Sequence, residues 1–570
     1  MPVDPVIQTI SDTSFWLPIA TFLPLVGVLV LVLWPKDDES SIKLIGIATA
    51  AATFAAGLVL LGRFDFDQAE KLQFFADHQW IEFVRSNYTV GLDGISLPLF
   101  ILSSFITLVV MIYTYENMPD AGNPKSFIIL MLVLQVGMAG TFVAQDLILF
   151  FVFFEMVLLP MYFMIGVWGG EDRQYASLKF FLYTMFGSAL MLVAFLALFF
   201  QTGAESFSFI HLSEAGGLLS RDVQVWIFAG MFVGFAVKVP MFPFHTWLPD
   251  AHTQAPTQGS VILAAVMLKL GTYGFVRIAI PFLPDGAKAW APVIGILAVI
   301  GIIYGALCCL AQSDMKRLIA FSSVAHMGFV MLGISTLTPF GINAAMFGMV
   351  AHGLITGMLF FIAGSVKHRY HTLEIARLKA MLISMPKLGW ILGFCAMASL
   401  GLPGLAGFWG EFPAILAAYS PGFGLSQALF RTLMVIAAIG TVLAAAYLLW
   451  LYQRTAFGSV DQARLGHGGT GQDGHDSTGH DNHDGTGHDR GPGVTPVGAV
   501  GAAVNPAHLD GSDADHGARH DDLHDVTPIE WISWLPLLVL IVVLGVYPQL
   551  LFQVLDPAVN GMVDRLGGFL

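Results

Sequence analysis

Six ionisable side chains stand inside strongly apolar stretches of this sequence. They are two carboxylates, two ammonium groups and two imidazoles: Glu155, Lys238, Lys269, His326, His352 and Glu411. An unpaired ionisable group at the centre of a membrane helix costs about 2.5–3.5 kcal/mol on insertion scales, so a chain that keeps several of them is expected to use them. Because each group can bind and release a proton, the pattern is typical of a proton pathway.

The alternative for each residue is a structural role, in which the side chain reaches the interface or forms a local hydrogen bond. Reaching the interface works best within a turn or two of a helix end. Glu155 lies nine residues after Asp146 and fourteen before Gly169, which at about 1.5 Å per residue places it near mid-depth. Three more are similarly far from flanking polar residues: Lys238, Lys269 and His352. We therefore favour function.

The stretch FAVKVPMFPFHTWLPDAH (residues 235–252) interrupts its apolar segment beside a lysine. Pro240 and Pro243 lack N–H donors, so the carbonyls of Ala236 and Val239 are expected to lose their helical partners. A free carbonyl inside a membrane needs water or a side chain. We expect a polar pocket here that accommodates the ammonium group.

A second interruption, SLGLPGLAGFWGEF (residues 399–412), repeats this device and carries Glu411. Paired interruptions at corresponding positions of two halves indicate an inverted repeat. The fifth, seventh and eighth apolar segments would then correspond to the tenth, twelfth and thirteenth, with no second equivalent of Lys269. Each half would hold a half-channel.

The composition shows which solvent surrounds these segments. Of 570 residues, 56% are hydrophobic and only 12% charged, and the mean hydropathy is +0.73, whereas soluble proteins carry about twice that charged fraction. We predict an all-α polytopic membrane protein with about fourteen spans of the ~20 residues a bilayer requires. They centre near residues 25, 52, 103, 133, 155, 190, 232, 267, 300, 328, 352, 395, 440 and 542.

The N-terminus has acid where a cleavable signal needs base, so the run from Trp16 to Trp34 is expected to be a retained first helix. Lys and Arg cluster in the loops after the first, ninth, eleventh and thirteenth segments, which predicts that these loops face the cytoplasm and that both termini face outward. The loop at 63–87 is a mild exception. Three cysteines in apolar runs, Cys308, Cys309 and Cys395, suggest neither disulfides nor a metal site.

Residues 458–528 differ from the rest, because Gly, Asp and His replace the apolar pattern and TGHD recurs at Thr478 and Thr486. We predict a disordered cytoplasmic loop. Its nine histidines could capture Zn²⁺, but a structural site needs about four ligands in fixed geometry and no scaffold holds them here. The net charge of −14 lies largely in this loop and gives no support to nucleic-acid binding.

The predicted division of the chain has five parts. They are residues 1–115 with helices 1–3, 116–285 as the first repeat with helices 4–8, 286–457 as the second repeat with helices 9–13, the loop 458–528, and 529–570 with helix 14.

Together these stretches resemble one known family. The segments FFEMVLLPMYFMIG, FAVKVPMFPFHTWLPDAHTQAPTQGSVILAAVMLKLGTYG, QSDMKRLIAFSSVAHMG, AHGLITGMLFF and LGLPGLAGFWGEF are similar to the antiporter-like membrane subunits of respiratory complex I. In particular they resemble the chain M type of NADH-quinone oxidoreductase, the bacterial counterpart of the mitochondrial fourth ND subunit. The similarity runs from about Asp93 to Tyr452 and is highly specific.

The resemblance implies a fourteen-helix subunit of the membrane arm, in a bacterial plasma membrane, that moves protons along a central axis. Electron transfer from NADH to quinone in other subunits would drive it. The implied roles are an interacting carboxylate and lysine, a central lysine relay, two linking histidines and a terminal acid: Glu155, Lys238, Lys269, His326, His352 and Glu411.

Glu411 favours the chain M type, because the chain L and chain N types and the Mrp sodium/proton antiporters usually have lysine at the second interruption. The sequence stops at Leu570, so we expect no long amphipathic helix, as in the chain L type, after the last segment. The segment rich in His, Gly and Asp departs from the family pattern, so the resemblance gives it no role.

Redox cofactors are expected in partner subunits, since this sequence has no GxGxxG opening a βαβ unit, no CxxC and no cysteine cluster. Those cofactors would be flavin, iron–sulfur clusters and quinone, and the neighbours would be other membrane-arm chains, especially the L and N types. Two alternatives stay open. One is a subunit of a Mrp-type antiporter or a membrane-bound hydrogenase, and the other is an assembly scaffold whose polar groups only hold helices together.

Deleting residues 466–521 is expected to leave membrane assembly and quinone-linked turnover almost unchanged, since a disordered surface segment makes few contacts that a fold needs. The amount of assembled complex and its NADH oxidation rate measure this. Loss of assembly on deletion, or after treatment with a metal chelator, would show that the segment has a structural or metal-binding role.

Overall fold

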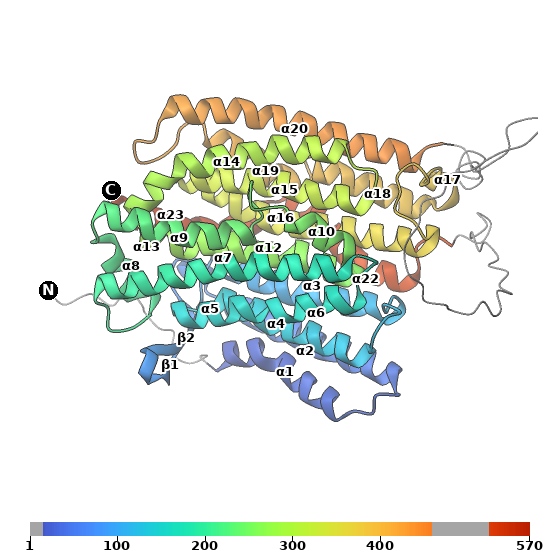
Figure 1. Cartoon of the computed structure of the whole chain (residues 1–570), viewed down its shortest axis with the longest axis horizontal. Coiled ribbons are helices and arrows are strands. Elements are labelled where there is room, and N and C mark those ends of the chain that lie inside the picture. The colour runs from blue at the N-terminus through green and yellow to red at the C-terminus, as the bar shows by residue number, and fades with distance from the viewer. Residues whose placement is uncertain (1–14, 459–523, 570) are drawn as a thin grey trace, which may run out of the picture.

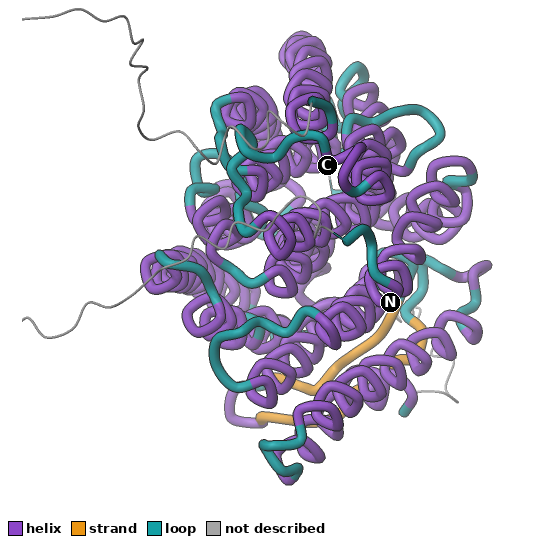
Figure 2. The backbone as a smooth tube through the Cα atoms, turned by 90° about the vertical axis from the view of Figure 1, so that its right-hand side faces the viewer, coloured by secondary structure: helices purple, strands orange, loops and turns teal. Residues whose placement is uncertain are grey.

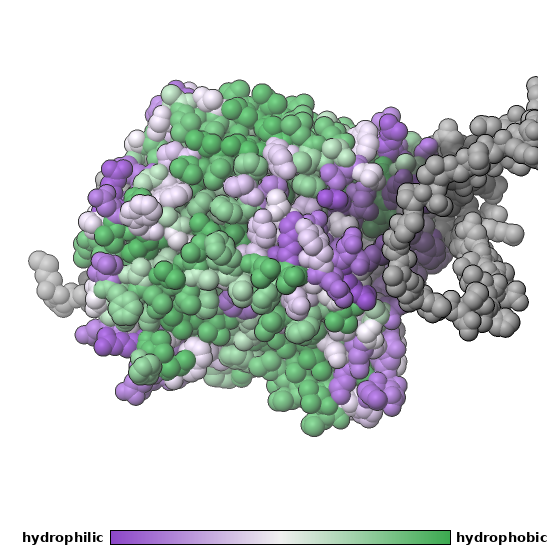
Figure 3. Space-filling model, in the orientation of Figure 1, coloured by the Kyte–Doolittle hydropathy of each residue, from purple (hydrophilic) through white to green (hydrophobic). Residues whose placement is uncertain are grey.

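Long helices lying side by side make up most of this computed structural model, which describes residues 15–458 and 524–569 (Figure 1). A view turned by 90° shows most helices nearly end-on, so they run roughly parallel (Figure 2). Apolar side chains cover most of the visible face, while polar ones gather toward its two ends and in one patch to the right of its middle (Figure 3). A largely apolar outer surface is expected for a bundle that crosses a bilayer.

The first part of the bundle runs to the end of the eighth predicted segment, at Phe282. Its helices are α1 (Trp16–Leu33), α2 (Glu39–Arg63), α3 (Leu97–Glu116), α4 (Pro124–Val143), α5 (Leu147–Met156), α6 (Leu158–Trp168), α7 (Arg173–Thr202), α8 (Phe209–Gly217), α9 (Arg221–Lys238), α10 (Trp247–Gln254), α11 (Thr257–Ile262), α12 (Leu268–Gly274) and α13 (Ile280–Phe282). Two π-helical stretches, η3 (Leu263–Met267) and η4 (Phe275–Ala279), join the last three into one continuous segment. Short 3-10 turns occupy η1 (Phe66–Gln68) and η2 (Glu82–Val84).

The second part contains the most deeply buried helices. Its elements are α14 (Pro284–Leu310), α15 (Met315–Ser335), α16 (Pro339–Tyr370), α17 (Met381–Ser384), α18 (Pro386–Ser399), α19 (Ala406–Ala417), α20 (Gln427–Ala456), α22 (Pro528–Val546) and α23 (Gln549–Gly567). The most apolar stretches of α15 and α16 are entirely buried, whereas about a third of that of α20 is. The centre of the molecule is therefore formed by the two helices that carry His326 and His352.

The predicted all-α membrane fold is confirmed, and a helix lies at each of the fourteen predicted centres. Within the described residues, twelve helical segments are long and apolar enough to cross a membrane, so the count of fourteen is not established. The two other predicted segments are the interrupted ones. α9 stops at Lys238, and α18 and α19 have only 14 and 12 residues, because the Gly and Pro residues between them break the helix.

The polar loop predicted at residues 63–87 instead contains a β-hairpin. Strands β1 (Gln73–Ile81) and β2 (Ser86–Leu92) pair antiparallel, with Ala76 opposite Val90 and His78 opposite Tyr88. The hairpin is fastened to the start of α5, since Asp146 accepts hydrogen bonds from the Ser86 hydroxyl at 2.8 Å and from the Asn87 N–H at 3.2 Å.

We expected no long amphipathic helix after the last membrane segment. The structure instead has α23 there, an amphipathic helix of 19 residues. Its apolar face packs on the core, with Phe552 5.0 Å from Phe347 between ring centres. Its polar side adds a hydrogen bond of 2.7 Å from the Asn343 amide to Asp556. Polar and charged residues alternate with buried ones along α23, so composition averaged over a window does not mark it as a helix.

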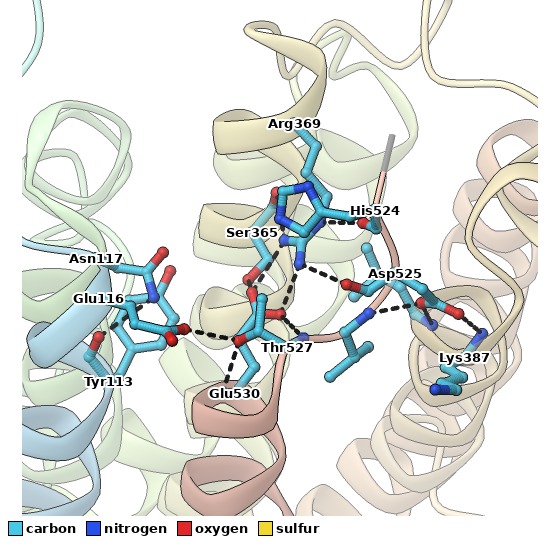
Figure 4. A network of polar contacts seen from close by, with 12 residues as sticks. Tyr113, Glu116, Asn117, Ser365, Arg369, Lys387, His524, Asp525, Thr527 and Glu530 are labelled. Atoms are coloured by element: carbon cyan, nitrogen blue, oxygen red, sulfur yellow. Dashed lines mark hydrogen bonds and ion pairs between the residues drawn. The ribbon is translucent and has the colours of Figure 1, made fainter. Parts of the chain in front are cut away.

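Most of the predicted loop 458–528, from residue 459 to 523, lies outside the described residues. Its last five residues, 524–528, are held firmly, which corrects the predicted boundary (Figure 4). Arg369 of α16 donates to the backbone carbonyl of His524 at 2.8 Å, and the Asp525 carboxylate accepts from the N–H groups of Lys387 and Leu388. Thr527 then caps α22 together with Glu530 in a capping box.

A buried ion pair fixes the start of α22 at this point (Figure 4). Glu530 Oε2 lies 2.7 Å from Arg369 Nη2, and their side chains are only 1% and 2% exposed. Ser365 donates a further, short hydrogen bond to Glu530. Since both charges are removed from water, the pair holds α22 against α16 only while both partners are present.

Replacing Glu530 with Ala is expected to lower the free energy of unfolding by about 3–5 kcal/mol, because Arg369 would be left buried without its carboxylate. Thermal unfolding of the detergent-solubilised protein measures the loss. The matched control is Glu374→Ala, which removes the ion pair between Glu374 and Arg377, whose side chains are 47% and 49% exposed. Because this pair is exposed, the substitution is expected to lower the free energy of unfolding by less than about 1 kcal/mol. Equal effects of the two substitutions would contradict a special role for the buried pair.

Candidate functional site

Glu155 lies where the fifth membrane segment bends. α5 ends at Met156, a single turn residue follows, and α6 begins at Leu158. Pro160 explains the bend, because it has no N–H for the carbonyl of Met156. Glu155 is half-buried, and the Ser188 hydroxyl lies within reach of its carboxylate. Its Oε1 atom is buried with no hydrogen-bond partner among the described residues.

Lys238 is the last residue of α9 and is 2% exposed. Its ammonium group lies 4.7 Å from the ring centre of Phe154, the neighbour of Glu155, which is a cation–π distance. The charges of Glu155 and Lys238 act on each other through space, yet no direct ion pair joins them in the described structure. The two residues of the predicted pair therefore lie near each other but form no direct ion pair in the described structure.

The interruption after Lys238 takes a form that differs in part from the prediction. The carbonyl of Ala236 finds a new partner in the N–H of Met241 at 2.9 Å. The carbonyl of Val237 accepts from the Trp247 indole at 2.9 Å. The prediction of a free carbonyl at Ala236 was therefore wrong, because the sharp turn at the prolines brings later donors back onto the end of α9.

Lys269 is completely buried on α12, between the two π-helical stretches. A π turn shifts the backbone hydrogen bonds by one residue and so changes which carbonyls are available. The carbonyl of Ala264, in η3, accepts from the Lys269 ammonium group at 2.5 Å. The second contact of that group is Nδ1 of His352 at 2.8 Å.

Gly271 allows α12 to approach α9 beside the other lysine. A Cβ atom at this position would lie 2.8 Å from the carbonyl oxygen of Phe235 and 3.0 Å from Cβ of Lys238. Any larger residue would push the helices apart. The two lysine-bearing helices are therefore in direct backbone contact.

His352 and His326 continue the row on α16 and α15. They are 7% and 6% exposed, and their ring centres are 6.1 Å apart. Nε2 of His352 has no hydrogen-bond partner within the described chain. Both rings line a small cavity with about 20 Å³ of space for water centres, which is enough for about one water molecule.

Glu411 on α19 closes the row. Its Oε1 atom lies 2.5 Å from Nδ1 of His326, while Nε2 of the same ring contacts the hydroxyls of Ser399 and Tyr447, each at 3.1 Å. This arrangement fits a histidine whose Nδ1–H donates to the carboxylate and whose Nε2 accepts. Gly401 makes room at the interruption, since its φ of +78° suits glycine and a Cβ there would lie 3.2 Å from Glu411 Oε2.

The structure thus joins four of the six predicted residues into one row, from Lys269 through His352 and His326 to Glu411, and places Glu155 and Lys238 beside its start. Sequence reasoning missed Ser399 and Tyr447, which have ordinary polar side chains in apolar runs. It also passed over His252, which is fully buried, stacked 4.4 Å above the Phe360 ring and without a hydrogen-bond partner on either ring nitrogen in the part of the chain described. Its position in the first interruption was the available signal.

Comparison with known proteins identifies the family of the chain. Residues 144–443 match the family described as NADH:quinone oxidoreductase/Mrp antiporter, TM. Residues 71–141 match the amino terminus of NADH-ubiquinone oxidoreductase chain 4. The first match includes all six residues of the candidate site.

Relatives from bacteria and plants cover most of the chain. NADH-quinone oxidoreductase subunit M of Rhodobacter capsulatus is 43% identical over 458 residues, covering 78% of this chain and 86% of that protein. NADH-ubiquinone oxidoreductase chain 4 of Arabidopsis thaliana is 40% identical over 438 residues, covering 77% of this chain and 86% of that protein.

Among solved structures, a chain of respiratory complex I from Thermus thermophilus with bound NADH superposes with a TM-score of 0.77 at 27% identity, covering 97% of this chain and all of that one. A chain of the Mrp complex from Dietzia shares the fold alone, with a TM-score of 0.73 at 18% identity and coverage of 96% and 98%. The predicted resemblance is confirmed, and the chain belongs to the subunit M (chain 4) family of NADH-quinone oxidoreductases.

Proposed function

We propose that this chain is a proton-translocating subunit in the membrane arm of an NADH:quinone oxidoreductase. The observation that carries the proposal is the row of buried titratable groups from Lys269 to Glu411, with a gap that one water can bridge between the two histidines, in a chain whose relatives are subunit M of that enzyme. A purely structural role would not require four ionisable groups at the centre of the bundle, because each of them is costly to bury.

The contacts support a defined course for a proton. Nζ of Lys269 can pass its proton to Nδ1 of His352 across 2.8 Å. His352 and His326 both line the small cavity, and a single water there would carry the proton from one ring to the other. Nδ1 of His326 can then deliver it to Glu411 across 2.5 Å.

Glu155 and Lys238 would regulate proton transfer along this row by acting on the charge of Lys269. A carboxylate near an ammonium group stabilises its charge, and a charged Lys238 disfavours a second charge on the lysine of the helix packed against it. The gap between Glu155 and Lys238 leaves room for this influence to change. Their side chains would therefore position the proton on Lys269 rather than carry it.

The wider setting belongs to the same proposal. The neighbours would be other antiporter-like chains of the membrane arm, especially the L and N types, and flavin, iron–sulfur clusters and quinone would reside in other subunits. The complex would lie in a bacterial plasma membrane with both termini of this chain outside and the segment rich in His, Gly and Asp in the cytoplasm. The two predicted repeats, 116–285 and 286–457, would each supply one half-channel.

Glu155→Gln is expected to lower NADH:quinone turnover and proton pumping together, by about tenfold if its charge contributes about 1.4 kcal/mol to the rate-limiting proton step. Turnover of inverted membrane vesicles and their proton uptake measure the two rates. Ser188→Ala, which removes only the hydroxyl near the carboxylate, serves as the milder control. Full wild-type rates in an assembled complex would remove Glu155 from the proposal.

Glu411→Gln preserves the shape of the side chain and removes its titration, so both rates are expected to fall by similar factors. Glu411→Asp should retain a measurable part of both, because the carboxyl survives one methylene further back. The comparison is NADH-driven proton uptake against NADH oxidation for the two variants. Normal pumping by the Gln variant would exclude Glu411 from the route, and loss of assembly in both variants would indicate a structural glutamate.

A further inference from the structure

A second, much larger cavity opens at the end of the bundle where α8, α13 and α23 lie, on the left of Figure 1. It has about 370 Å³ of space for water centres, against about 20 Å³ in the cavity between the histidines. We call it the terminal vestibule. Its charged and polar lining comes from the hairpin region, α8, η4 and α23: Glu70, Lys71, Asp93, Ser213, Glu214, Arg277 and Arg565. Gln145 and apolar residues of the same elements make up the rest of the lining, and a space of this size with these polar groups on its wall has room for several water molecules.

A rigid ion pair forms part of the wall of the vestibule. Arg277 Nη2 lies 2.7 Å from Asp93 Oδ2, and the side chains are 13% and 6% exposed. The other oxygen of Asp93 accepts from the N–H groups of Ile95 and Ser96, at 3.1 and 3.0 Å. With its carboxylate held on both sides, the pair cannot reorient without breaking several hydrogen bonds.

Tyr273 connects this pair to the interior. Arg277 Nε donates to the Tyr273 hydroxyl at 3.1 Å, and that hydroxyl donates to the carbonyl of Phe142 at 2.9 Å. Tyr273 is completely buried and stands four residues from Arg277 and four from Lys269. Tyr273 and Lys269 share one face of α12, and Arg277 follows in the π-helical stretch η4, eight residues after Lys269, which corresponds to about 12 Å along a regular helix at ~1.5 Å per residue.

The charges around the pair oppose the passage of a proton. Arg565 of α23 lies close enough for its charge to act on both Arg277 and Asp93. The guanidinium groups of Arg277 and Arg565 therefore both act near the carboxylate of Asp93, while Lys71, Glu70 and Glu214 also line the vestibule. Fixed positive charge beside a proton path repels protons and other cations, as in selective membrane pores.

We propose that the terminal vestibule is the aqueous mouth of the half-channel that contains Lys269, and that the Asp93–Arg277 pair, with Tyr273 beneath it, seals this mouth against proton leak. The inference rests on the proposed function, since a seal matters only where protons move. Asp93 and Arg277 are positioning residues in this account, and the proton that must be held back is the one on Lys269.

The test is the double variant Asp93→Asn with Arg277→Gln, which removes both charges and keeps side chains of similar shape. In sealed vesicles the number of protons taken up per NADH oxidised should fall at least twofold, and an imposed proton gradient should decay several times faster than in wild type. NADH oxidation itself should persist, because Lys269 and the row beyond it are untouched. Glu214→Gln, on the wall of the vestibule but outside the pair, is the matched control and should leave the ratio unchanged.

The ratio of protons to NADH does not depend on how much complex assembles, so a purely structural defect would lower both rates and leave the ratio intact. A wild-type ratio and leak rate in the double variant would overturn the inference. If the ratio is normal there while Glu155→Gln and Glu411→Gln still depress pumping, only the seal is refuted. If those two variants also pump normally, the proposed function itself fails.

Cysteine labelling tests the vestibule without disturbing the pair. Ser213→Cys, on the wall, should react with a membrane-impermeant maleimide at least ten times faster than Thr272→Cys, which is fully buried on α12 beyond the pair. The unsubstituted chain, with its own cysteines, gives the background. Equal labelling of the two positions would show that the pair does not separate water from the interior.

Discussion

The structure depends on the cost of keeping a charge away from water. Inside a bilayer, a charged side chain and an unpaired backbone group are both expensive, and only groups that find partners can stay. Three departures from regular helix among the described residues lie beside such a group. The chain turns after Lys238, the helix widens into π turns around Lys269, and a glycine opens the backbone next to Glu411.

Much of this could be predicted from the sequence, because hydropathy, proline and glycine act locally. The apolar segments follow from the length a bilayer needs, and the two interruptions follow from residues without an N–H or without a side chain. The six titratable residues could be selected from the sequence because their neighbours in the chain are apolar. Their selection did not depend on knowing their contacts in the fold.

The contacts that organise the site could not be predicted, because they join residues far apart in the chain. Lys269 meets His352 across 83 residues, and His326 meets Tyr447 across 121. Spacing along one helix gives no information on such pairs. The π turns could not be predicted either, since they arise from packing rather than from a residue that forbids the α-helix. Nor could the N–H of Met241 be predicted as the new partner of the Ala236 carbonyl.

Two oppositely charged pairs in the first half of the chain differ in a way that matches their proposed tasks. Asp93 and Arg277 touch at 2.7 Å and are held by further hydrogen bonds, whereas Glu155 and Lys238 interact through space, with the ammonium group of Lys238 against the Phe154 ring. A closed pair resists change, because breaking it leaves charges buried alone. A loose pair can strengthen or weaken with small movements of its helices. A barrier to protons needs a closed pair such as Asp93 and Arg277, and a control element needs a loose pair such as Glu155 and Lys238. Two pairs of the same charge types can therefore serve opposite purposes, according to how tightly the surrounding backbone holds them.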